Sequence, residues 1–539
     1  MTASDGYGRR QVTAILSGLL LATFVASLDQ TVVAAAMYRI GESLGGLTAQ
    51  AWVTTAFLIT STVSVPVFGK LSDAHGRRPL FVAAIAVFLA GSALCALADS
   101  MLMLAACRAF QGVGAGGILT LTSAVMGDVV APRERAKYGG WFVAVYAVAS
   151  VVGPVTGGAL AGQRTLLGVD GWRWIFLLNL PVGIAAGLVV TRVLRAGQPR
   201  RRQRRLDVAG TLTLIIASVP LLLVASRGQA WGWGAPSSAL CYAIGVLGLA
   251  GFLLAERRAG DSALLTLRLF RNHGFAVGAG QSLVVNIGMF ASIVLLPLYL
   301  QLVRGFSPTA AGLLMLPQVA GTLLGAVLAG QFTARTGRYK ILPVTGSALL
   351  LAGMLLLGRL GAGTPLLSAE GVMFLIGAGS TLYAQTITLS MQNALPQADL
   401  GVATSSNTFF RQIGATAGAA VFLSITYSAA GPAIRTAYAR ASSSSLHAVA
   451  ATHPAQAGAL RLASSGSQSA LNNTAFLARL SPVLAQPFRQ GFTSALDVAF
   501  LVAALVMSAA LVLALLIREL PLRTTVNAQP AAPAEPVKQ

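Results

Sequence analysis

The chain has little charge, few acidic residues and very little cysteine or histidine. Of its 539 residues only 10% are charged, and 38 Lys and Arg residues outnumber 16 acidic ones. A soluble globular protein carries about 25% charged residues, so this composition excludes most soluble enzymes. The three cysteines and four histidines are scattered, without the spacing of a metal site or a disulfide framework. We expect neither a metal nor a cofactor.

Apolar sequence is what the chain has in excess, since 55% of its residues are hydrophobic. Stretches of about 20 apolar residues, long enough to cross a bilayer, recur about fourteen times. They are continuous rather than alternating, which indicates helices and not the strands of a barrel. The sequence therefore predicts an all-α membrane protein with fourteen transmembrane helices. Their centres lie near residues 25, 60, 88, 114, 150, 183, 216, 245, 287, 321, 350, 378, 415 and 506.

The net charge of +22 follows the predicted membrane topology. With the N-terminus in the cytosol, the predicted cytosolic segments hold 25 of the 38 Lys and Arg residues, and the short outer loops hold six. Because basic loops stay in the cytosol, both termini are predicted to be cytosolic. The basic cluster at 200–205 is then a cytosolic charge cluster, and lipid or nucleic-acid binding is the alternative role.

A loop sequence occurs twice. Residues 69–78, GKLSDAHGRR, return in weaker form at 330–340, GQFTARTGRYK. Each copy follows the second helix of a predicted six-helix set, as two parallel repeats require, and two more helices fit between the sets. The predicted parts are a cytosolic N-terminus 1–11, a six-helix bundle 12–198, a basic loop with two extra helices 199–258, a second six-helix bundle 259–519 with a long outer loop 430–490, and a disordered cytosolic tail 520–539.

The repeated loop resembles the cytosolic signature of the major facilitator superfamily, and other motifs are similar to its fourteen-span drug:proton antiporter branch. The resemblance implies the major facilitator fold, with two six-helix bundles and two extra helices between them. In this signature, acidic and basic residues form a latch that holds the bundles in the outward-facing state. A tight basic turn would explain the same sequence without a latch. The latch residues implied here are Gly69, Asp73, Gly76, Arg77 and Arg78, with Asp128 and Arg135 as neighbours.

Two ionisable residues lie deep within the predicted helices. Asp29 belongs to residues 28–36, LDQTVVAAA, and Arg108 opens residues 108–117, RAFQGVGAGG. At about 1.5 Å per residue both reach a similar depth towards the outer side. Burial favours the protonated form of a carboxyl and a nearby guanidinium favours the charged form, so movement between these settings can load and release a proton. We therefore predict that Asp29 and Arg108 couple protons, with a fixed buried ion pair as the alternative.

Residues 153–158, GPVTGG, resemble the antiporter signature of the superfamily. The family pattern has a further glycine four positions before this motif, where the chain has Ala149. A proline kink and close helix contact through glycines would together bar a leak pathway, although packing alone also explains such a helix. The motif residues are Gly153, Pro154, Gly157 and Gly158.

Polar and large apolar side chains on several helices are candidates for lining a central cavity. Each polar one could equally make an interhelical hydrogen bond. Arg411 lies ten residues into its helix and needs a partner, but no acidic residue of the second half is equally deep. Residues 172–183 and 401–418 are also similar to the antiporter branch. The candidates are Phe24, Tyr146, Gln281, Asn286, Met289, Phe290, Gln318, Gln385, Asn407 and Arg411.

The resemblance implies a proton-driven exporter of lipophilic, cationic or neutral compounds in the plasma (inner) membrane of a bacterium, working by alternating access. Its partners would be a small-molecule substrate, protons and the lipid bilayer, with no nucleic acid and no obligate protein partner. A dedicated exporter of an endogenous metabolite or antibiotic is the alternative with the same mechanism. A membrane enzyme or a channel is more remote, because the sequence lacks a nucleotide loop or catalytic dyad and a channel needs no repeated latch loops.

Overall fold

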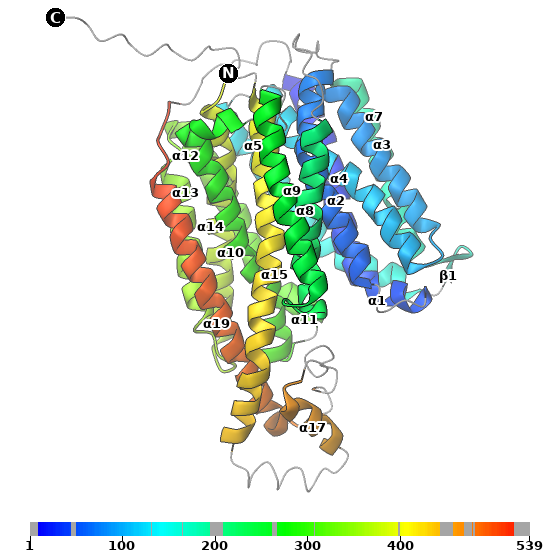
Figure 1. Cartoon of the computed structure of the whole chain (residues 1–539), viewed down its shortest axis with the longest axis vertical. Helices are drawn as coiled ribbons and strands as arrows, with labels where there is room; N and C mark the ends of the chain where they lie inside the picture. Colours follow the sequence, from blue (N-terminus) through cyan, green and yellow to red (C-terminus); the bar gives the residue numbers. More distant parts are fainter. Residues whose placement is uncertain are drawn as a thin grey trace, which may run out of the picture.

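The computed structural model describes residues 9–44, 50–130, 132–163, 165–194, 208–260, 267–306, 308–396, 399–441, 456–467, 477 and 480–521. Most of these residues lie in helices, which confirms the predicted all-α membrane fold (Figure 1). A helix satisfies its backbone N–H and C=O groups within its own segment, as lipid requires. The strands found in the described residues form one short antiparallel hairpin of β1 (Thr165–Leu166) and β2 (Val169–Asp170), with Leu166 opposite Val169.

In the first bundle, α4 packs against α2 and α3, and α1 packs against α5 and α7. The segments α6 and α7 form one broken helix, because Pro181 has no N–H to donate to the carbonyl of Leu177. The bounds are α1 (Arg9–Ser43), α2 (Gln50–His75), α3 (Arg77–Ala96), α4 (Met101–Val129), α5 (Pro132–Gly162), α6 (Arg173–Leu177) and α7 (Asn179–Val193).

In the second bundle, α14 packs against α12 and α13, while α15 and α19 pack against α10 and against each other. Its extended apolar core follows the inner faces of these helices. The bounds are η3 (Leu267–Arg271), α10 (His273–Leu298), η4 (Tyr299–Val303), α11 (Pro308–Leu314), α12 (Leu316–Thr336), α13 (Ile341–Leu357), α14 (Leu366–Asn393), α15 (Leu400–Arg440), α17 (Ala457–Ser465) and α19 (Pro482–Leu515).

The two extra helices, α8 (Val208–Trp231) and α9 (Pro236–Ala259), form a hairpin beside the seam between the bundles. The helix α8 contacts α2 of the first bundle and α15 of the second. Leu214 and Phe252 of the hairpin share an apolar cluster with Val65 of α2 and Phe409 of α15. The basic cluster 200–205 and residues 522–539 of the predicted tail lie outside the described residues.

Eleven helices among the described residues are long and apolar enough to cross a membrane. Two shorter apolar helices, Ala209–Val224 and Ile341–Leu357, and the helix α5 occupy three further predicted positions. Each predicted centre therefore falls within a helix. The total of fourteen spans stays a prediction.

The long outer segment predicted over 430–490 is shorter in the structure, because α15 continues to Arg440 and α19 begins at Pro482. Alanine is a strong helix former, so the helices persist where the sequence is no longer apolar enough to span. With 41 residues α15 is about 60 Å long, twice the hydrocarbon thickness, and one end projects beyond the membrane. There Tyr438 donates a hydrogen bond of 2.7 Å to the carbonyl of Leu484, and α17 packs alongside (Figure 1).

The two bundles meet at one end and their helices diverge towards the other (Figure 1). We call the first the basic end, where α2 turns into α3 and α12 into α13, and the other the far end, where α17 lies. At the basic end a Cβ on Gly139 of α5 would lie 3.0 Å from Gln385 Oε1 of α14. A Cβ on Gly127 of α4 would lie 3.4 Å from Gln392 Nε2 of the same helix α14. These contacts between bundles close the basic end.

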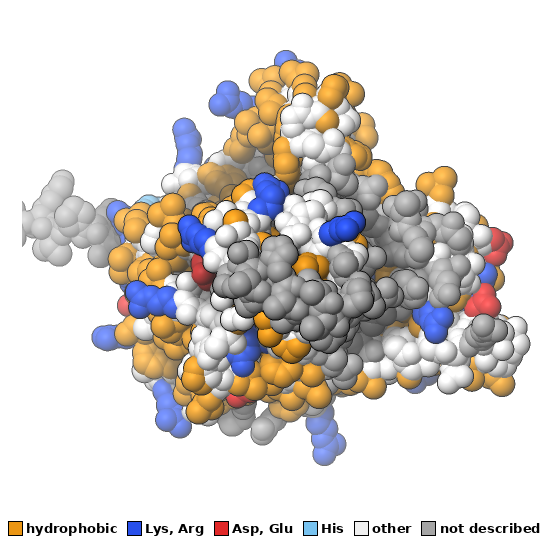
Figure 2. Space-filling view, turned by 90° about the horizontal axis from the view of Figure 1, so that it is seen from below, with side chains coloured by type: hydrophobic (Ala, Val, Ile, Leu, Met, Phe, Trp, Pro, Cys, Tyr) orange, Lys and Arg blue, Asp and Glu red, His pale blue; other side chains and the backbone are white. Residues whose placement is uncertain are grey.

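Arginine side chains also occur at the far end. Seen from this side, basic side chains lie among apolar ones over the rim and over the projecting helices (Figure 2). Arg435 and Arg440 on α15 and Arg461 on α17 are exposed there. The two ends therefore differ in how many basic residues they carry, and not in whether they carry any. This is expected because the charge rule does not apply to a long outer segment.

Candidate functional site

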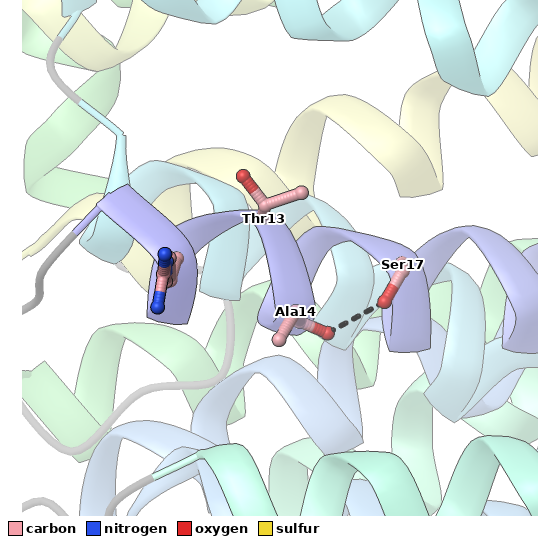
Figure 3. A pocket seen from close by; sticks show the side chains of 4 residues that line it. Thr13, Ala14 and Ser17 are labelled. Carbon is pink, nitrogen blue, oxygen red and sulfur yellow. Dashed lines mark hydrogen bonds between the residues drawn. The ribbon is translucent and has the colours of Figure 1, made fainter.

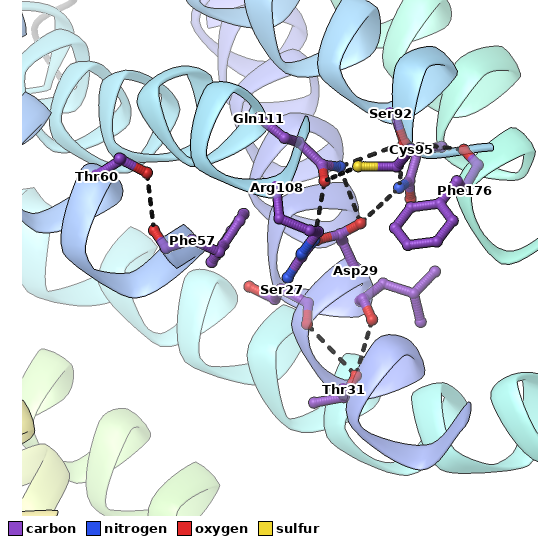
Figure 4. Close-up of polar contacts among 12 residues, drawn as sticks. Ser27, Asp29, Thr31, Phe57, Thr60, Ser92, Cys95, Arg108, Gln111 and Phe176 are labelled. Carbon is purple, nitrogen blue, oxygen red and sulfur yellow. Dashed lines mark hydrogen bonds and ion pairs between the residues drawn. The ribbon is translucent and has the colours of Figure 1, made fainter. Parts of the chain in front are cut away.

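A buried ion pair joins α1 and α4. Asp29 and Arg108 are 1% and 2% exposed, and Arg108 Nη1 lies 2.5 Å from Asp29 Oδ2 (Figure 4). The sequence predicts that these two residues couple protons, and the structure brings them into direct contact. An ionised side chain inside a membrane is costly unless it is paired, so each residue provides the partner that the other needs.

Two amides complete the surroundings of the carboxylate. Asp29 Oδ1 accepts hydrogen bonds from Gln111 Nε2 at 3.0 Å and from Asn179 Nδ2 at 2.8 Å. Gln111 Oε1 in turn accepts a hydrogen bond of 2.8 Å from Arg108 Nη1, so this amide contacts both members of the pair. The carboxylate thus receives three donors from α4 and α7. Hydrogen bonds to an ionised acceptor are about twice as strong as neutral ones, which makes this a rigid arrangement.

Ser92 on α3 and Phe57 on α2 connect the remaining helices to the ion pair. Ser92 Oγ accepts hydrogen bonds from the two amides at 2.9 and 3.3 Å and donates one of 2.9 Å to the carbonyl of Phe176. The guanidinium carbon of Arg108 lies 4.0 Å from the centre of the Phe57 ring, a cation–π contact (Figure 4). We call Asp29, Arg108, Gln111, Asn179 and Ser92 the buried polar network.

Four of these contacts were not predicted from the sequence, those of Gln111, Asn179, Ser92 and Phe57. A signal existed for two of them. Gln111 follows Arg108 by one helical turn, and Asn179 lies in the segment 172–183 that resembles the antiporter branch. A serine or a phenylalanine in an apolar helix is too common to indicate such a role.

Glycines on α4 let its neighbours approach closely enough to form the network. A Cβ on Gly112 would lie 2.5 Å from the carbonyl oxygen of Phe57, and one on Gly114 would lie 2.4 Å from the amide nitrogen of Phe88. Any larger residue would push α2 or α3 away. These contacts hold the Phe57 ring over the guanidinium of Arg108.

The turn between α2 and α3 is fastened to the end of α4. Gly76 has a φ of 92°, in the left-handed region that glycine adopts without strain. Arg77 Nε donates a hydrogen bond of 2.8 Å to Asp128 Oδ2, and Arg77 Nη1 donates one to Ser72 Oγ. These described contacts join helices of the first bundle to one another.

Two other residues implied for the latch lie on either side of the turn between α2 and α3. Gly69 at the end of α2 is buried, and Arg78 at the start of α3 is half-buried. The side chains of Asp73 and Arg135 lie outside the described residues. A latch between the two bundles therefore stays a prediction.

The antiporter motif lies where α5 crosses α1. A Cβ on Gly153 would lie 2.0 Å from Thr31 Oγ1, and this hydroxyl donates a hydrogen bond of 3.0 Å to the carbonyl of Ala149. Thr31 lies only half a turn from Asp29 on α1 (Figure 4). The contact with Gly153 and Ala149 therefore ties α5 to the helix that carries the carboxylate. The remaining motif residues are the buried Gly157, the exposed Gly158 and Pro154, whose side chain lies outside the described residues.

Three of the candidates for cavity lining are buried in the second bundle and hydrogen-bonded there. Gln281 Nε2 donates to Ser347 Oγ at 3.2 Å, and Asn286 Nδ2 donates to the carbonyl of Ser282 at 2.8 Å. Asn407 accepts a hydrogen bond of 2.5 Å from Ser282 Oγ and donates one of 2.8 Å to a threonine of α14. These contacts favour the alternative that the sequence left open, hydrogen bonding within and between helices.

The remaining cavity candidates are only partly buried. Tyr146 on α5 is 55% exposed although it lies in the middle of its helix. The others are half-buried, and they come from both bundles: Phe24, Met289, Phe290, Gln318, Gln385 and Arg411. Partial exposure in the interior of a helical bundle is what a residue lining a space between the bundles would have.

A hollow of about 410 Å³ opens at the start of α1 (Figure 3). It is lined by Arg10, Thr13, Ala14 and Ser17, which follow one face of the helix. Ser17 precedes Asp29 by about 18 Å along the helix axis at 1.5 Å per residue. The hollow is therefore separate from the buried polar network. In the described residues no group of His, Cys, Asp and Glu is arranged to hold a metal ion.

The family model described as the Major Facilitator Superfamily matches residues 19–419. The Multidrug transporter protein MdtP of Bacillus subtilis is 36% identical over 407 residues, which cover 75% of this chain and 74% of that protein. Multidrug resistance protein 3 of the same species is 29% identical over 409 residues, 76% of this chain and 78% of that one. The solved structure of the proton:xylose symporter XylE shares the fold, with a TM-score of 0.55 at 15% identity over 95% of this chain and 97% of that one.

Sequence, structure and relatives agree on the family. The family match covers about three quarters of the chain, and the two helical bundles have counterparts over nearly the whole length of a solved transporter. The predicted resemblance, and the prediction that the chain is not an enzyme, are confirmed. The chain belongs to the Major Facilitator Superfamily and is a multi-pass membrane transporter of small molecules.

Proposed function

We propose that the chain exports lipophilic small molecules in exchange for protons, by alternating access. The observation that carries the proposal is the Asp29–Arg108 pair, a carboxylate and a guanidinium buried together inside the first bundle. A single buried carboxyl linked to several helices can change the packing of those helices when it gains a proton. The names of two relatives, a multidrug transporter and a multidrug resistance protein, support export of lipophilic compounds.

The route of the proton follows from the direction in which the bundles open. Asp29 lies about 30 Å along α1 from its start at the basic end, so it is nearer to the far end. The bundles diverge there, and a proton from that side reaches the carboxyl over the shorter path. Protonation removes the charge that holds Arg108, Gln111 and Asn179 in place. The network then rearranges, the far end closes and the basic end opens.

The proton site and the substrate site are separate in this proposal. Both oxygens of Asp29 are occupied by donors of the protein itself, so the carboxylate does not contact a substrate in this conformation. The substrate binds between the bundles, where half-buried residues of both bundles lie. Coupling then passes through α1 and α5, which touch at Thr31 and Gly153.

The proposed setting is the inner membrane of a bacterium, with the basic end in the cytosol. The number of basic residues in the segments at that end supports this orientation. Energy comes from the proton gradient without a cofactor, and the partners are the substrate, protons and the lipid bilayer. Neither a nucleic acid nor an obligate protein partner is part of the mechanism.

Everted membrane vesicles test the proposal. Vesicles from cells that express the chain should accumulate lipophilic fluorescent dyes when respiration acidifies their interior, and a protonophore should abolish the accumulation. Vesicles containing Asp29→Asn at equal abundance provide the control. Accumulation that persists with the protonophore, or that needs sodium ions instead of protons, would overturn the proposal.

A further inference from the structure

We propose that Arg411 and Tyr383 bind an anionic oxygen group of the substrate, so that the preferred substrates are lipophilic organic acids. The inference rests on the proposed function, because it assigns the substrate class of the transport site between the bundles. This class differs from the cationic or neutral substrates that the family resemblance implies.

Arg411 has no charged partner among the described residues. It lies about 16 Å along α15 from Leu400, and its side chain is half-buried. Two acidic residues of the second bundle are engaged elsewhere: Asp399 pairs with Arg268 at 3.5 Å, and Glu519 accepts a hydrogen bond from Tyr339 N. Two others lie at other depths, Glu370 about 6 Å from the far-end start of α14 and Asp497 about 27 Å from the basic-end terminus of α19. An arginine within a membrane segment faces a partner or a hydrated pathway.

The hydroxyl of Tyr383 on α14 provides a second, independent observation. Tyr383 is 1% exposed, and its hydroxyl has no hydrogen bond of acceptable geometry within the described part of the chain. Ser282 and Asn286 of α10 lie close to this hydroxyl, but the Ser282 hydroxyl donates to Asn407 and one N–H of Asn286 donates to the carbonyl of Ser282. A buried hydroxyl without a partner is costly, so a group that is absent from the apoprotein has a reason to bind it.

Arg411 follows Asn407 by one turn on α15, and Asn407 is hydrogen-bonded to Ser282 of α10 and to Thr388 of α14. Tyr383 lies about 15 Å along α14 from Asn393 and Arg411 about 16 Å along α15 from Leu400, so the two side chains lie at similar depth from the basic end.

Tyr146 on α5 also lies within electrostatic range of Arg411. Tyr146 belongs to the first bundle and is 55% exposed. We include Tyr146 in the proposed site, which then has residues of both bundles. A substrate bound here contacts both halves, which is what alternating access requires of a transport site.

The chemistry of these groups selects the charge of the ligand. A guanidinium donates hydrogen bonds and accepts none, and a tyrosine hydroxyl beside it donates most readily to an oxygen that carries negative charge. The carboxylate of the first bundle does not offset this preference, because Asp29 is enclosed by Arg108, Gln111 and Asn179 (Figure 4). The charged side chain of the proposed site is therefore the guanidinium of Arg411.

The apolar body of the ligand has a surface to rest on. Met289 and Phe290 are half-buried and lie one turn of α10 beyond Asn286, which is close to Tyr383. They lie on the side of the far end, towards which the bundles diverge. A carboxylate or phenolate at Arg411 would therefore leave an aromatic or aliphatic body against these two residues.

Equilibrium binding of acid and ester pairs to the purified full-length chain in lipid nanodiscs tests this proposal. The probes are pyrenebutyrate with its methyl ester and naphthoate with its methyl ester, which share shape and apolar surface but differ in charge. The wild type should bind at least one acid about tenfold more tightly than its ester, as expected for a hydrogen-bonded charge pair. Arg411→Gln should weaken the acid to the level of the ester and leave the ester unchanged.

Three further variants guard against a trivial loss of folding. Arg411→Lys should retain part of the preference for the acid, and Tyr383→Phe should reduce it by about threefold, consistent with one hydrogen bond. Arg359→Gln, which removes an exposed arginine after α13, should bind like the wild type. All variants are first compared with the wild type by size-exclusion chromatography, and if Arg411→Gln is misfolded the decision passes to Arg411→Lys and Tyr383→Phe.

Equal binding of acid and ester by the wild type, or no binding of either acid, overturns the inference. An undiminished preference for the acid in the folded Arg411 and Tyr383 variants overturns it as well. The measurement uses no proton gradient, so its outcome is independent of proton coupling. Failure of proton-driven export with a clear preference for the acid would remove the proposed function and leave this site in place.

Discussion

Asp29 accepts hydrogen bonds from three side chains, so a neutral replacement affects the stability of the first bundle as well as its proton binding. An asparagine has one acceptor oxygen and an amino group, and the amino group would face the donors of Gln111, Asn179 or Arg108. It would also leave the guanidinium buried without a countercharge. Loss of one partner from a buried pair costs about 3–5 kcal/mol, so folding and proton coupling must be measured separately.

Asp29→Asn should abolish proton-driven export, because an amide does not bind and release protons in the physiological range. It should also lower the amount of folded protein. The double variant Asp29→Asn with Arg108→Gln removes the unpaired charge and should recover abundance without recovering transport. Dye export and folded abundance in the same membranes are the two measurements. Uncoupler-sensitive export by Asp29→Asn would transfer the proton role to Glu370, Asp497 or Asp128.

Asn179→Ala should alter the pH dependence of export without abolishing it. Asn179 donates to Asp29 Oδ1 at 2.8 Å, and a donor to a carboxylate favours its ionised form. Without it one of the three contacts that hold the carboxylate is lost, so the midpoint of the pH profile should differ from that of the wild type. The profile is measured as substrate-driven proton release by the purified protein.

Asn393→Ala is the matched control for this shift, because it removes an amide of the second bundle that bonds to the carbonyls of Leu520 and Pro521. Its profile should coincide with that of the wild type. A midpoint that stays fixed in Asn179→Ala would show that the amide does not govern the carboxylate.

Sequence reasoning reached the ion pair because a charge inside an apolar run is rare enough to require a partner. It did not reach the amides or Ser92, because polar uncharged residues are common in membrane helices and their partners depend on how the helices rotate. For the same reason Gln281 and Asn407 were candidates for the cavity, whereas their side chains are buried in hydrogen bonds. Exposure in the folded bundle, not residue type, separates the two groups.

At the scale of elements, the turn between α2 and α3 joins two helices of the first bundle to the end of α4, at a distance from the buried polar network. Arg77→Ala removes the hydrogen bond to Asp128 and should slow the conformational cycle while leaving equilibrium substrate affinity close to that of the wild type. The physical reason is that the turn lies at the basic end and not between the bundles at mid-membrane. Turnover and equilibrium binding are measured on the same purified protein.

Arg338→Ala is the control, since Arg338 is an exposed arginine at the corresponding turn of the second bundle. It should cycle at the rate of the wild type. A large loss of affinity in Arg77→Ala, with normal turnover at saturating substrate, would contradict the assigned role of the turn.

Replacement of α8 and α9 by a cytosolic linker of similar reach should lower abundance more than it lowers the turnover of each surviving molecule. The hairpin covers α2 and α15 with apolar side chains at the seam, and no acidic residue of α8 or α9 belongs to the buried polar network. Abundance by immunoblot and export per molecule are compared. Normal abundance together with loss of proton coupling would show that the hairpin takes part in coupling.

The positions of the helices were predictable because each apolar run of about 20 residues is much longer than the segments that connect most of the runs. Their ends were less predictable. The extensions of α15 and α19 beyond the predicted spans depend on contacts with each other, such as that of Tyr438 with Leu484, which no local pattern contains. The break between α6 and α7 had a local cause in Pro181, but the sequence alone did not show whether the chain would turn there or continue.

At the scale of the whole molecule, contacts between the bundles at the basic end define one conformation of the cycle. A disulfide or short cross-link between Gly139→Cys and Gln385→Cys should trap it, because these positions face each other across the bundles. The background carries Ala at Cys95, Cys107 and Cys241. Cross-linking should arrest export, reduction should restore it, and a probe added from the far side should still bind to the trapped protein.

Each single cysteine variant treated in the same way should retain export, which excludes a simple effect of modification. Export that continues at its normal rate in the fully cross-linked protein would show that the basic end does not open during the cycle.

The close glycine contacts of α4 have a mechanical consequence. Because Gly112 and Gly114 bring its backbone against α2 and α3, these three helices resist bending relative to one another and act as a stiff beam. The contacts at the basic end then serve as its fulcrum. A stiff beam transmits a repacking at the buried polar network, which lies nearer to the far end, along its whole length instead of absorbing it by bending. The close backbone contacts of Gly112 and Gly114 thus determine how much of the movement caused by protonation of Asp29 reaches the opposite face of the membrane.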